Sequence, residues 1–218
     1  MARHAHWSVA QRACLDVAWL VFGLPHRLRI EARANVPPSG GLLVVANHAS
    51  VLDPVFLSLA VPRPLRFLVK PLPPGFEPVQ SIYDTYGCIT AGSGRQLALA
   101  MGETARAVAD GAALAIFPEG RVSPDGRLLP FQTGAARVAL TTGCAILPAW
   151  IEGAHRAMPP GRVLPRLAPV SVRFGSVFHL GRRVGAGPPR AHDLNRATMV
   201  LTEAVARLAP AAEMSHSC

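Results

Sequence analysis

The chain is poor in lysine and in aromatic residues. Lys70 is the only lysine, so arginine supplies almost all of the positive charge behind a net charge of +9. Aromatic residues make up 6% of the sequence, and Arg182–Arg183 is the only adjacent arginine pair. Nucleic-acid binding usually needs clustered basic residues and aromatic rings that stack on bases. We therefore expect no nucleic-acid partner, whereas arginine suits the phosphate of a substrate or anionic lipid headgroups.

Cysteine is scarce as well. The four cysteines lie far apart in the sequence, without a CxxC pair or a Cys/His cluster at metal-ligand spacing: Cys14, Cys88, Cys144 and Cys218. This spacing excludes a zinc-finger-like site, so we expect neither a metal nor another resident cofactor. Reduced thiols in a cytosolic compartment are favoured over a disulfide framework.

Long hydrophobic runs are missing. The best candidate, Ala13–Leu24, is short and contains Asp16. Because a helix needs about 20 apolar residues to span a bilayer, no transmembrane helix is expected. A secretory signal peptide is not indicated either, since Pro25–Arg27 stands where a small-residue cleavage site would be needed.

Residues 1–24 are expected to contribute an amphipathic helix, with residues 6–24 as its helical part. Trp7 and Trp19 lie among apolar neighbours, and arginines flank the segment. Tryptophans beside basic residues are typical of helices that lie in a membrane interface. We expect a peripheral helix on an anionic membrane surface, at the cytoplasmic side of the cell membrane; packing on the protein's own surface is the alternative.

What the chain does have is enough apolar material for one folded domain, since 50% of its 218 residues are hydrophobic and 16% are charged. Short apolar runs alternate with helical patterns, which predicts a single α/β domain over 25–209. Its central sheet is expected to be mostly parallel or mixed and flanked by helices, and residues 210–218 to be a frayed tail. The expected strands are 27–34, 42–46, 65–69, 112–117, 145–151 and 170–174, and the expected helices are 54–60, 96–110, 133–142 and 192–208. Residues 71–78 read as a loop, and 82–89 as ambiguous.

The most informative motif is the pair His48 and Asp53, which follows the apolar run 42–46. Histidine is suited to accept a proton near neutral pH, and a nearby carboxylate can orient its ring. On one straight helix the two side chains would point about 140° apart. They can meet only if His48 lies in the turn and Asp53 in the first helical turn, where Pro54 favours a helix start. The alternatives are a loop histidine and an aspartate that merely caps the helix.

A second motif, Phe117–Arg121, follows the apolar run 112–117 directly and reads Phe-Pro-Glu-Gly-Arg. Glu119 and Arg121 are then placed at the carboxyl end of a strand, where open α/β sheets bind ligands. The arginine could bind phosphate, and glycine allows close approach to the backbone. A tight turn with a surface ion pair is the plain alternative.

Two weaker motifs complete the set. Residues 87–95 form a glycine-containing segment that ends in Arg95 before a predicted helix, an arrangement that can bind an anion or be only a surface loop. Leu147–Pro148 lies within the predicted strand 145–151. Neither motif is specific by itself.

Taken in order, the motifs resemble those of the lysophospholipid acyltransferase family, which includes the 1-acylglycerol-3-phosphate acyltransferases. Asn47–Asp53 is similar to the family's NHxxxxD motif, and Phe117–Gly120 to its FPEG motif. The segment 87–95 occupies the place of the second motif, and Leu147–Pro148 that of the fourth. The resemblance extends over about residues 25 to 180.

The resemblance implies transfer of an acyl group from acyl-CoA or acyl carrier protein to a lysophospholipid hydroxyl, with 1-acylglycerol-3-phosphate as the first candidate acceptor. His48 is then the general base and Asp53 its orienting partner. Substrate binding is expected of Asn47, Arg95, Glu119, Gly120 and Arg121. Acyl-CoA or acyl carrier protein is a co-substrate in this scheme, so no cofactor is required.

Two departures from the family pattern leave the acceptor open. Arg95 stands farther from Gly87 than the arginine of the family's second motif usually does, and Arg121 follows Gly120 without an intervening threonine. A lyso-aminolipid is therefore an alternative acceptor. Two other classes stay open: a thioester hydrolase, in which His48 activates water, and a non-enzymatic basic module that binds anionic membranes or nucleic acid.

Overall fold

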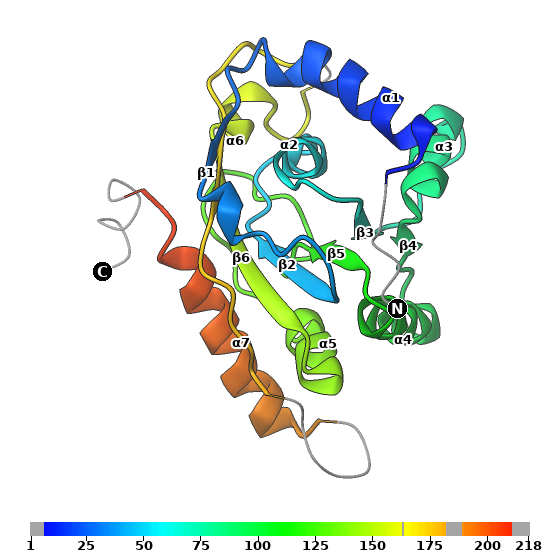
Figure 1. Ribbon diagram of the computed structural model, residues 1–218, viewed down its shortest axis with the longest axis vertical. Coiled ribbons are helices and arrows are strands. Elements are labelled where there is room, and N and C mark those ends of the chain that lie inside the picture. The colour runs from blue at the N-terminus through cyan, green and yellow to red at the C-terminus, as the bar shows by residue number, and fades with distance from the viewer. Residues whose placement is uncertain (1–6, 163, 182–188, 211–218) are drawn as a thin grey trace.

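The fold is built on one seven-stranded sheet, in the order β1-β7-β6-β2-β5-β3-β4 (Figure 1). The computed structural model describes residues 7–162, 164–181 and 189–210. The strands are β1 (Arg29–Glu31), β2 (Leu42–Ala46), β3 (Leu65–Val69), β4 (Ile89–Thr90), β5 (Ala113–Ile116), β6 (Ala145–Glu152) and β7 (Ser171–Phe174).

The sheet is mixed but mostly parallel. Strands β6, β2, β5, β3 and β4 run in parallel, whereas β7 is antiparallel to β6 and parallel to β1. In the register, Val45 lies between Pro148 of β6 and Ile116 of β5. The residues that follow β2 and β5 therefore emerge side by side, which brings the two strongest motifs to one edge of the sheet.

Helices cover both faces of the sheet. Their bounds are α1 (Val9–Ala18), α2 (Asp53–Ala60), α3 (Glu77–Tyr86), α4 (Arg95–Ala109), α5 (Gly134–Thr142), α6 (Ala154–Ala157) and α7 (Ala191–Ala206). Figure 1 shows α1, α2 and α6 on one side and α4, α5 and α7 on the other.

Strand β2 lies at the centre of the core. Leu42 and Val44 pack in the same cluster as Phe56 of α2, while Leu43 and Val45 pack with the cluster that contains α4, α5 and α7. All five residues of β2 are buried. A strand covered on both faces reads as a continuous apolar run, which explains why the run 42–46 predicts it well.

The predicted single α/β domain with a mostly parallel or mixed sheet is confirmed. The helix expected over 6–24 is shorter and in two parts: α1 begins after a Ser8 capping box with Gln11 and continues into a π-helical segment, η1 (Trp19–Gly23). The strand expected over 27–34 is limited to β1 at the sheet edge, and a 3₁₀ turn, η2 (Arg33–Asn35), follows it.

The ambiguous stretch 82–89 is mainly the end of α3, which begins inside the predicted loop 71–78. Helix α3 stops at Gly87, whose φ of +62° suits glycine. The predicted tail 210–218 lies, apart from Pro210, outside the described residues. In the part of the chain that the structure describes, no helix combines the length and the apolar character needed to cross a bilayer.

Candidate active site

The chain turns sharply between β2 and α2, and this turn carries the histidine and the aspartate. His48 Nδ1 lies 3.0 Å from Asp53 Oδ2. Asp53 is the first residue of α2, with Pro54 next in the helix. The contact predicted from the position of Pro54 is therefore present: one residue lies in the turn and the other in the first turn of the helix.

One carboxylate oxygen organises the turn. Asp53 is fully buried, and its Oδ2 accepts hydrogen bonds from the backbone N–H groups of Ala49 and Ser50, each at 2.7 Å, in addition to the His48 ring. Burial raises the pKa of the Asp53 carboxyl, and the hydrogen bond from His48 works against that rise. An Nδ1–H that donates to this oxygen leaves Nε2 of His48 as a proton acceptor.

Aromatic rings hold the His48 ring from the other side. The rings of His48 and Phe117 stack with centroids 4.3 Å apart and planes at 17°. Phe67 of β3 stacks behind Phe117 at 6.2 Å. The imidazole is thus held between an aromatic face and a carboxylate, while 17% of its side chain stays exposed to the groove described below.

Glu119 joins the two motifs through the backbone. Its side chain is buried, and Oε1 accepts a 2.7 Å hydrogen bond from the N–H of His48. Oε2 accepts a second one, at 3.1 Å, from the N–H of Leu129. Burial raises the pKa of Glu119 to about 7. Both carboxylate oxygens are therefore directed at backbone groups, and substrate contact by Glu119 stays a prediction.

The Phe117–Arg121 turn and the loop after it also make close backbone contacts. Gly120 has φ +68°, and a Cβ there would lie 2.3 Å from Nε2 of Gln132. Three residues after Gly120, the N–H of Ser123 donates to the C=O of His48 at 2.7 Å. With Glu119 on its N–H and Ser123 on its C=O, the backbone of His48 is bound on both sides.

Asn47 fastens the turn to the neighbouring strand. Its Nδ2 donates to the C=O of Ile151 at 3.0 Å, and its Oδ1 accepts from the N–H of Ile151 at 2.7 Å. The side chain is buried. The structure therefore gives Asn47 a bracing position next to His48; the predicted role in substrate binding stays a prediction.

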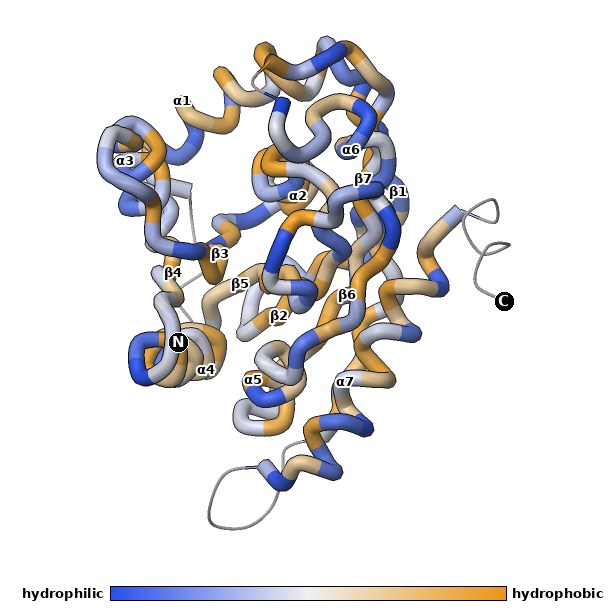
Figure 2. The backbone as a smooth tube through the Cα atoms, turned by 180° about the vertical axis from the view of Figure 1, so that it is seen from behind, coloured by the Kyte–Doolittle hydropathy of each residue, from blue (hydrophilic) through white to orange (hydrophobic). Residues whose placement is uncertain are grey.

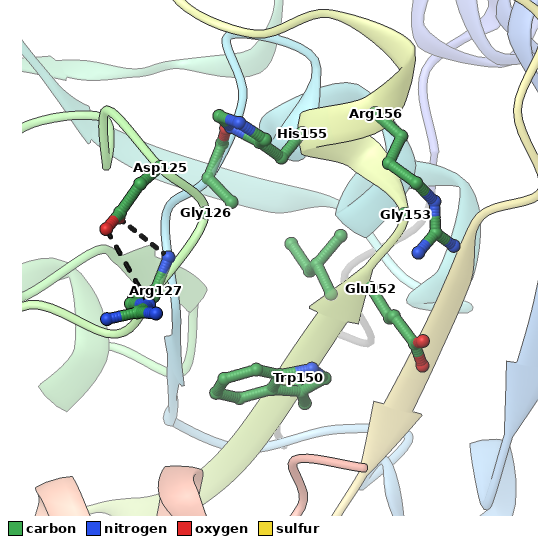
Figure 3. Close-up of a pocket in the computed structure, with 10 residues that line it drawn as sticks. Asp125, Gly126, Arg127, Trp150, Glu152, Gly153, His155 and Arg156 are labelled. Atoms are coloured by element: carbon green, nitrogen blue, oxygen red, sulfur yellow. Dashed lines mark hydrogen bonds and ion pairs between the residues drawn. The ribbon is translucent and has the colours of Figure 1, made fainter. Parts of the chain in front are cut away.

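Two further braces come from a part of the chain that the motifs do not include. Ser50 Oγ donates to the C=O of Met158 at 2.8 Å, and Nδ1 of His155 in α6 lies 3.1 Å from the C=O of Ala49. These partners are more than a hundred residues apart, so no local pattern could reveal them. Figure 3 shows His155 beside a small cavity of about 310 Å³ behind the turn, where Asp125 contacts Arg127.

A groove of about 1110 Å³ opens in front of His48. Part of its wall is apolar and comes from β3, α4 and α5, with Val69, Leu97, Met101 and Val138 as examples. Three cationic side chains also line it: Lys70, Arg121 and Arg137. A groove with both kinds of wall can hold an aliphatic chain and an anionic group, and it leaves the imidazole accessible to both.

The structure separates the predicted substrate-binding residues into groups. Gly120 and Arg121 line the groove with His48, whereas Arg95, the exposed first residue of α4, is not among the lining residues although Gly92 and Gly94 are. Leu147–Pro148 lies inside β6, paired with β2. Lys70 and Arg137 stand outside any motif, so nothing in the local sequence points to their place in the groove. Within the described ranges, no cluster of three or more His, Cys, Asp or Glu side chains could hold a metal ion.

The chain is similar in sequence to two proteins with the same name. The chain is 29% identical over 161 residues to 1-acyl-sn-glycerol-3-phosphate acyltransferase of Limnanthes alba, covering 72% of this chain and 56% of that protein. It is 25% identical over 142 residues to the enzyme of the same name from Borreliella burgdorferi, covering 64% and 56%. The chain thus spans little more than half the length of these relatives.

A solved structure has the same fold. The crystal structure of the 1-acyl-sn-glycerophosphate acyltransferase PlsC from Thermotoga maritima matches with a TM-score of 0.69 at 22% identity, over 91% of this chain and 82% of that one. The sequence profile of the family described as Acyltransferase matches residues 27–152, more than half of the chain and both principal motifs. The chain belongs to the Acyltransferase family.

Proposed function

We propose that this protein is an O-acyltransferase that moves a fatty acyl group from acyl-CoA or acyl carrier protein to the hydroxyl of a lysophospholipid, with 1-acylglycerol-3-phosphate as the acceptor. The observation that carries the proposal is the His48–Asp53 pair, 3.0 Å apart, at a groove with apolar and cationic walls. The names of the relatives support the same substrate class.

In the proposed reaction, Nε2 of His48 takes the proton of the acceptor hydroxyl while its oxygen attacks the thioester carbonyl. The new C–O bond forms, the C–S bond breaks, and the imidazolium returns the proton to the leaving thiolate. Asp53 holds the ring and stabilises its transient positive charge. General-base assistance of this kind contributes about 10²–10⁴-fold in rate.

The groove walls supply the positioning. Arg121, with Lys70 and Arg137 in the same lining, is suited to bind the phosphate of the acceptor. The apolar wall around Leu97 and Met101 is suited to the hydrocarbon part of a substrate. Holding both reactants beside Nε2 lowers the entropic part of the barrier.

The proposed setting is the cytoplasmic side of a membrane with an anionic surface, where the protein is a peripheral component. In α1, η1 and the residue that follows them, more than half of each of four apolar side chains is exposed, which suits an interfacial helix: Val17, Leu20, Val21 and Leu24. Removal of residues 1–24 is expected to weaken flotation with anionic vesicles.

The test is thiol release from acyl-CoA and from acyl carrier protein, with a panel of lysolipids and mass analysis of the products. We expect release to require a lysophospholipid, with 1-acylglycerol-3-phosphate giving the fastest turnover and diacylated product. Release that is independent of every lysolipid indicates a hydrolase instead. A lyso-aminolipid as the best acceptor corrects the substrate, and no release with a folded protein overturns the proposal.

A further inference from the structure

A second apolar segment lies beside the N-terminal helix. Leu164 and Leu167 are 72% and 79% exposed in the connection between α6 and β7. Leu20 of η1 and Leu24, which follows it, are 64% and 56% exposed. Figures 1 and 2 both place residues 159–162 and 164–169 next to η1 at the same end of the molecule.

Backbone hydrogen bonds fix the two segments to each other. The N–H of Val170 donates to the C=O of His26 at 2.9 Å, and the N–H of Arg29 donates to the C=O of Val170 at 2.9 Å. The N–H of Arg166 also donates to the C=O of Ala157 at 2.7 Å. Residues 159–162 and 164–169, hereafter the proline loop, are thus tied at their C-terminal side to the residues that follow η1.

The segment that contains Leu164 and Leu167 is basic. Residues 154–170 contain no aspartate or glutamate; residues 17–30 contain none either, although the exposed Asp16 lies one turn before Leu20. The two segments contain five arginines, all exposed: Arg27, Arg29, Arg156, Arg162 and Arg166. Exposed leucines in segments that also carry exposed arginines fit a surface that is apolar inside and anionic at its boundary, as an anionic bilayer is.

Two other exposed apolar residues lie in helices that also carry acidic residues. Met199 on α7 is 66% exposed, but the same helix carries Asp193 and Glu203. Leu99 on α4 is 65% exposed, with Glu103 one turn away. Exposure alone is common on protein surfaces and needs no partner. These two residues therefore serve as matched controls.

We infer that the proline loop is a second membrane-contacting element, in which Leu164 and Leu167 enter the lipid headgroup region beside η1 while the arginines bind anionic headgroups. The inference rests on the proposed function in taking a lipid surface as the partner. Two separate contacts fix the orientation of the domain on the membrane. With one amphipathic helix as the only contact, the domain could still rotate about the axis of that helix. Helix α1 packs on α2 and α3, and these contribute Pro54 and Tyr83 to the groove, so the orientation also sets how the groove meets the lipid.

The test is flotation of the full chain with vesicles of phosphatidylcholine and phosphatidylglycerol. Leu164→Gln together with Leu167→Gln changes no charge and is expected to weaken vesicle partitioning by roughly tenfold or more, since each leucine loses apolar burial. The matched control is Leu99→Gln together with Met199→Gln, which is expected to partition as the wild type does. Equal partitioning of the two double variants overturns the inference.

A second readout separates loss of contact from misfolding. Leu167→Trp is expected to add fluorescence that brominated lipids quench, whereas Met199→Trp adds fluorescence that they do not quench. Absence of quenching at position 167 contradicts the inference even if partitioning changes. A wild-type chain that does not bind vesicles overturns it too, while lysolipid-dependent thiol release with dispersed short-chain substrates still decides the proposed reaction independently.

Discussion

The polar residues around the active site fall into a buried set and an exposed set. Asn47, Asp53 and Glu119 are buried and direct their side chains at backbone groups and at the His48 ring. Arg121 and Arg137 are exposed in the groove, and none of the ion pairs among the described residues includes them. In the proposed mechanism, the buried set therefore holds the base in place and the exposed set is available to bind an anion. Changes in the buried set should lower kcat, and changes in the exposed set should raise KM.

The largest effect is expected for His48→Ala. Removing the base should lower kcat by about 10²–10⁴-fold, because no other group in the turn can take the hydroxyl proton. Steady-state thiol release with saturating acceptor measures it. Circular dichroism and the melting temperature serve as controls for folding, since the side chain is partly exposed. Acyl transfer at the wild-type rate in a folded variant would falsify the assigned role.

Asp53→Asn tests whether the buried set orients the base. The amide oxygen of the variant is expected to take the place of Oδ2, because the N–H groups of Ala49 and Ser50 donate to that position. The Nδ1–H of His48 then meets a neutral acceptor, which stabilises the imidazolium less than a carboxylate does. We expect kcat to fall by about 10²-fold or more, with the KM of the acceptor changed little. The pH dependence of kcat should change as well, since the pairing that stabilises the imidazolium is lost. A variant with a raised KM and an unchanged kcat would place Asp53 in the binding set instead.

Glu119→Gln distinguishes bracing from substrate contact. One end of the new amide faces an N–H donor of His48 or Leu129 with its own NH₂ group, so one hydrogen bond must break. We expect kcat to fall by about 10-fold, with a small change in KM. A larger change in KM than in kcat would assign Glu119 to the substrate after all.

The same residue predicts a pH dependence of stability. The pKa of Glu119 is raised from 4.5 to about 7 by burial, so the folded protein binds this proton more tightly than the unfolded chain. Its contribution to the free energy of unfolding is therefore complete below about 4.5 and decreases as the pH rises towards about 7. The melting temperature of the wild type, measured between these pH values, should therefore include a decrease with rising pH that comes from Glu119. The Glu119→Gln variant should not show this decrease.

The smallest expected effect on catalysis is that of Arg121→Ala. Losing a cation in the groove should raise the KM of a phosphate-bearing acceptor by about 10-fold and leave kcat within about twofold. Arg95→Ala is the matched control, because Arg95 is exposed but does not line the groove. If both substitutions raise the KM equally, the two arginines do not differ in role. In that case the segment 87–95 belongs to the acceptor site as well.

The sequence predicts the centre of the fold better than its periphery. Strands β2 and β5 are covered on both faces, so their composition alone identifies them. Pro54 likewise fixes the helix start that lets His48 meet Asp53. Helix α3 was missed because prolines and a glycine precede it, and its own apolar content is low. The contacts of Asn47 with Ile151 and of Ser50 with Met158 join residues that only the three-dimensional fold brings together.

The direction in which a side chain points is a second property that the sequence alone does not predict. Glu119 and Arg121 stand two residues apart in one turn, yet one is buried behind His48 and the other is exposed in the groove. Residue type favours this division, since a carboxylate can accept from backbone N–H groups and a guanidinium can only donate. Which backbone groups are left to donate depends on the register of distant strands, and a local motif does not contain that information.

The turn around Asp53 has a dynamic consequence. Three successive amide protons, those of His48, Ala49 and Ser50, all end on carboxylate oxygens of Glu119 and Asp53. Amides held in this way exchange with solvent deuterium only when the turn opens. The exchange rates of these three protons therefore measure how often the turn that holds His48 opens. They can be measured in the protein without any lipid substrate.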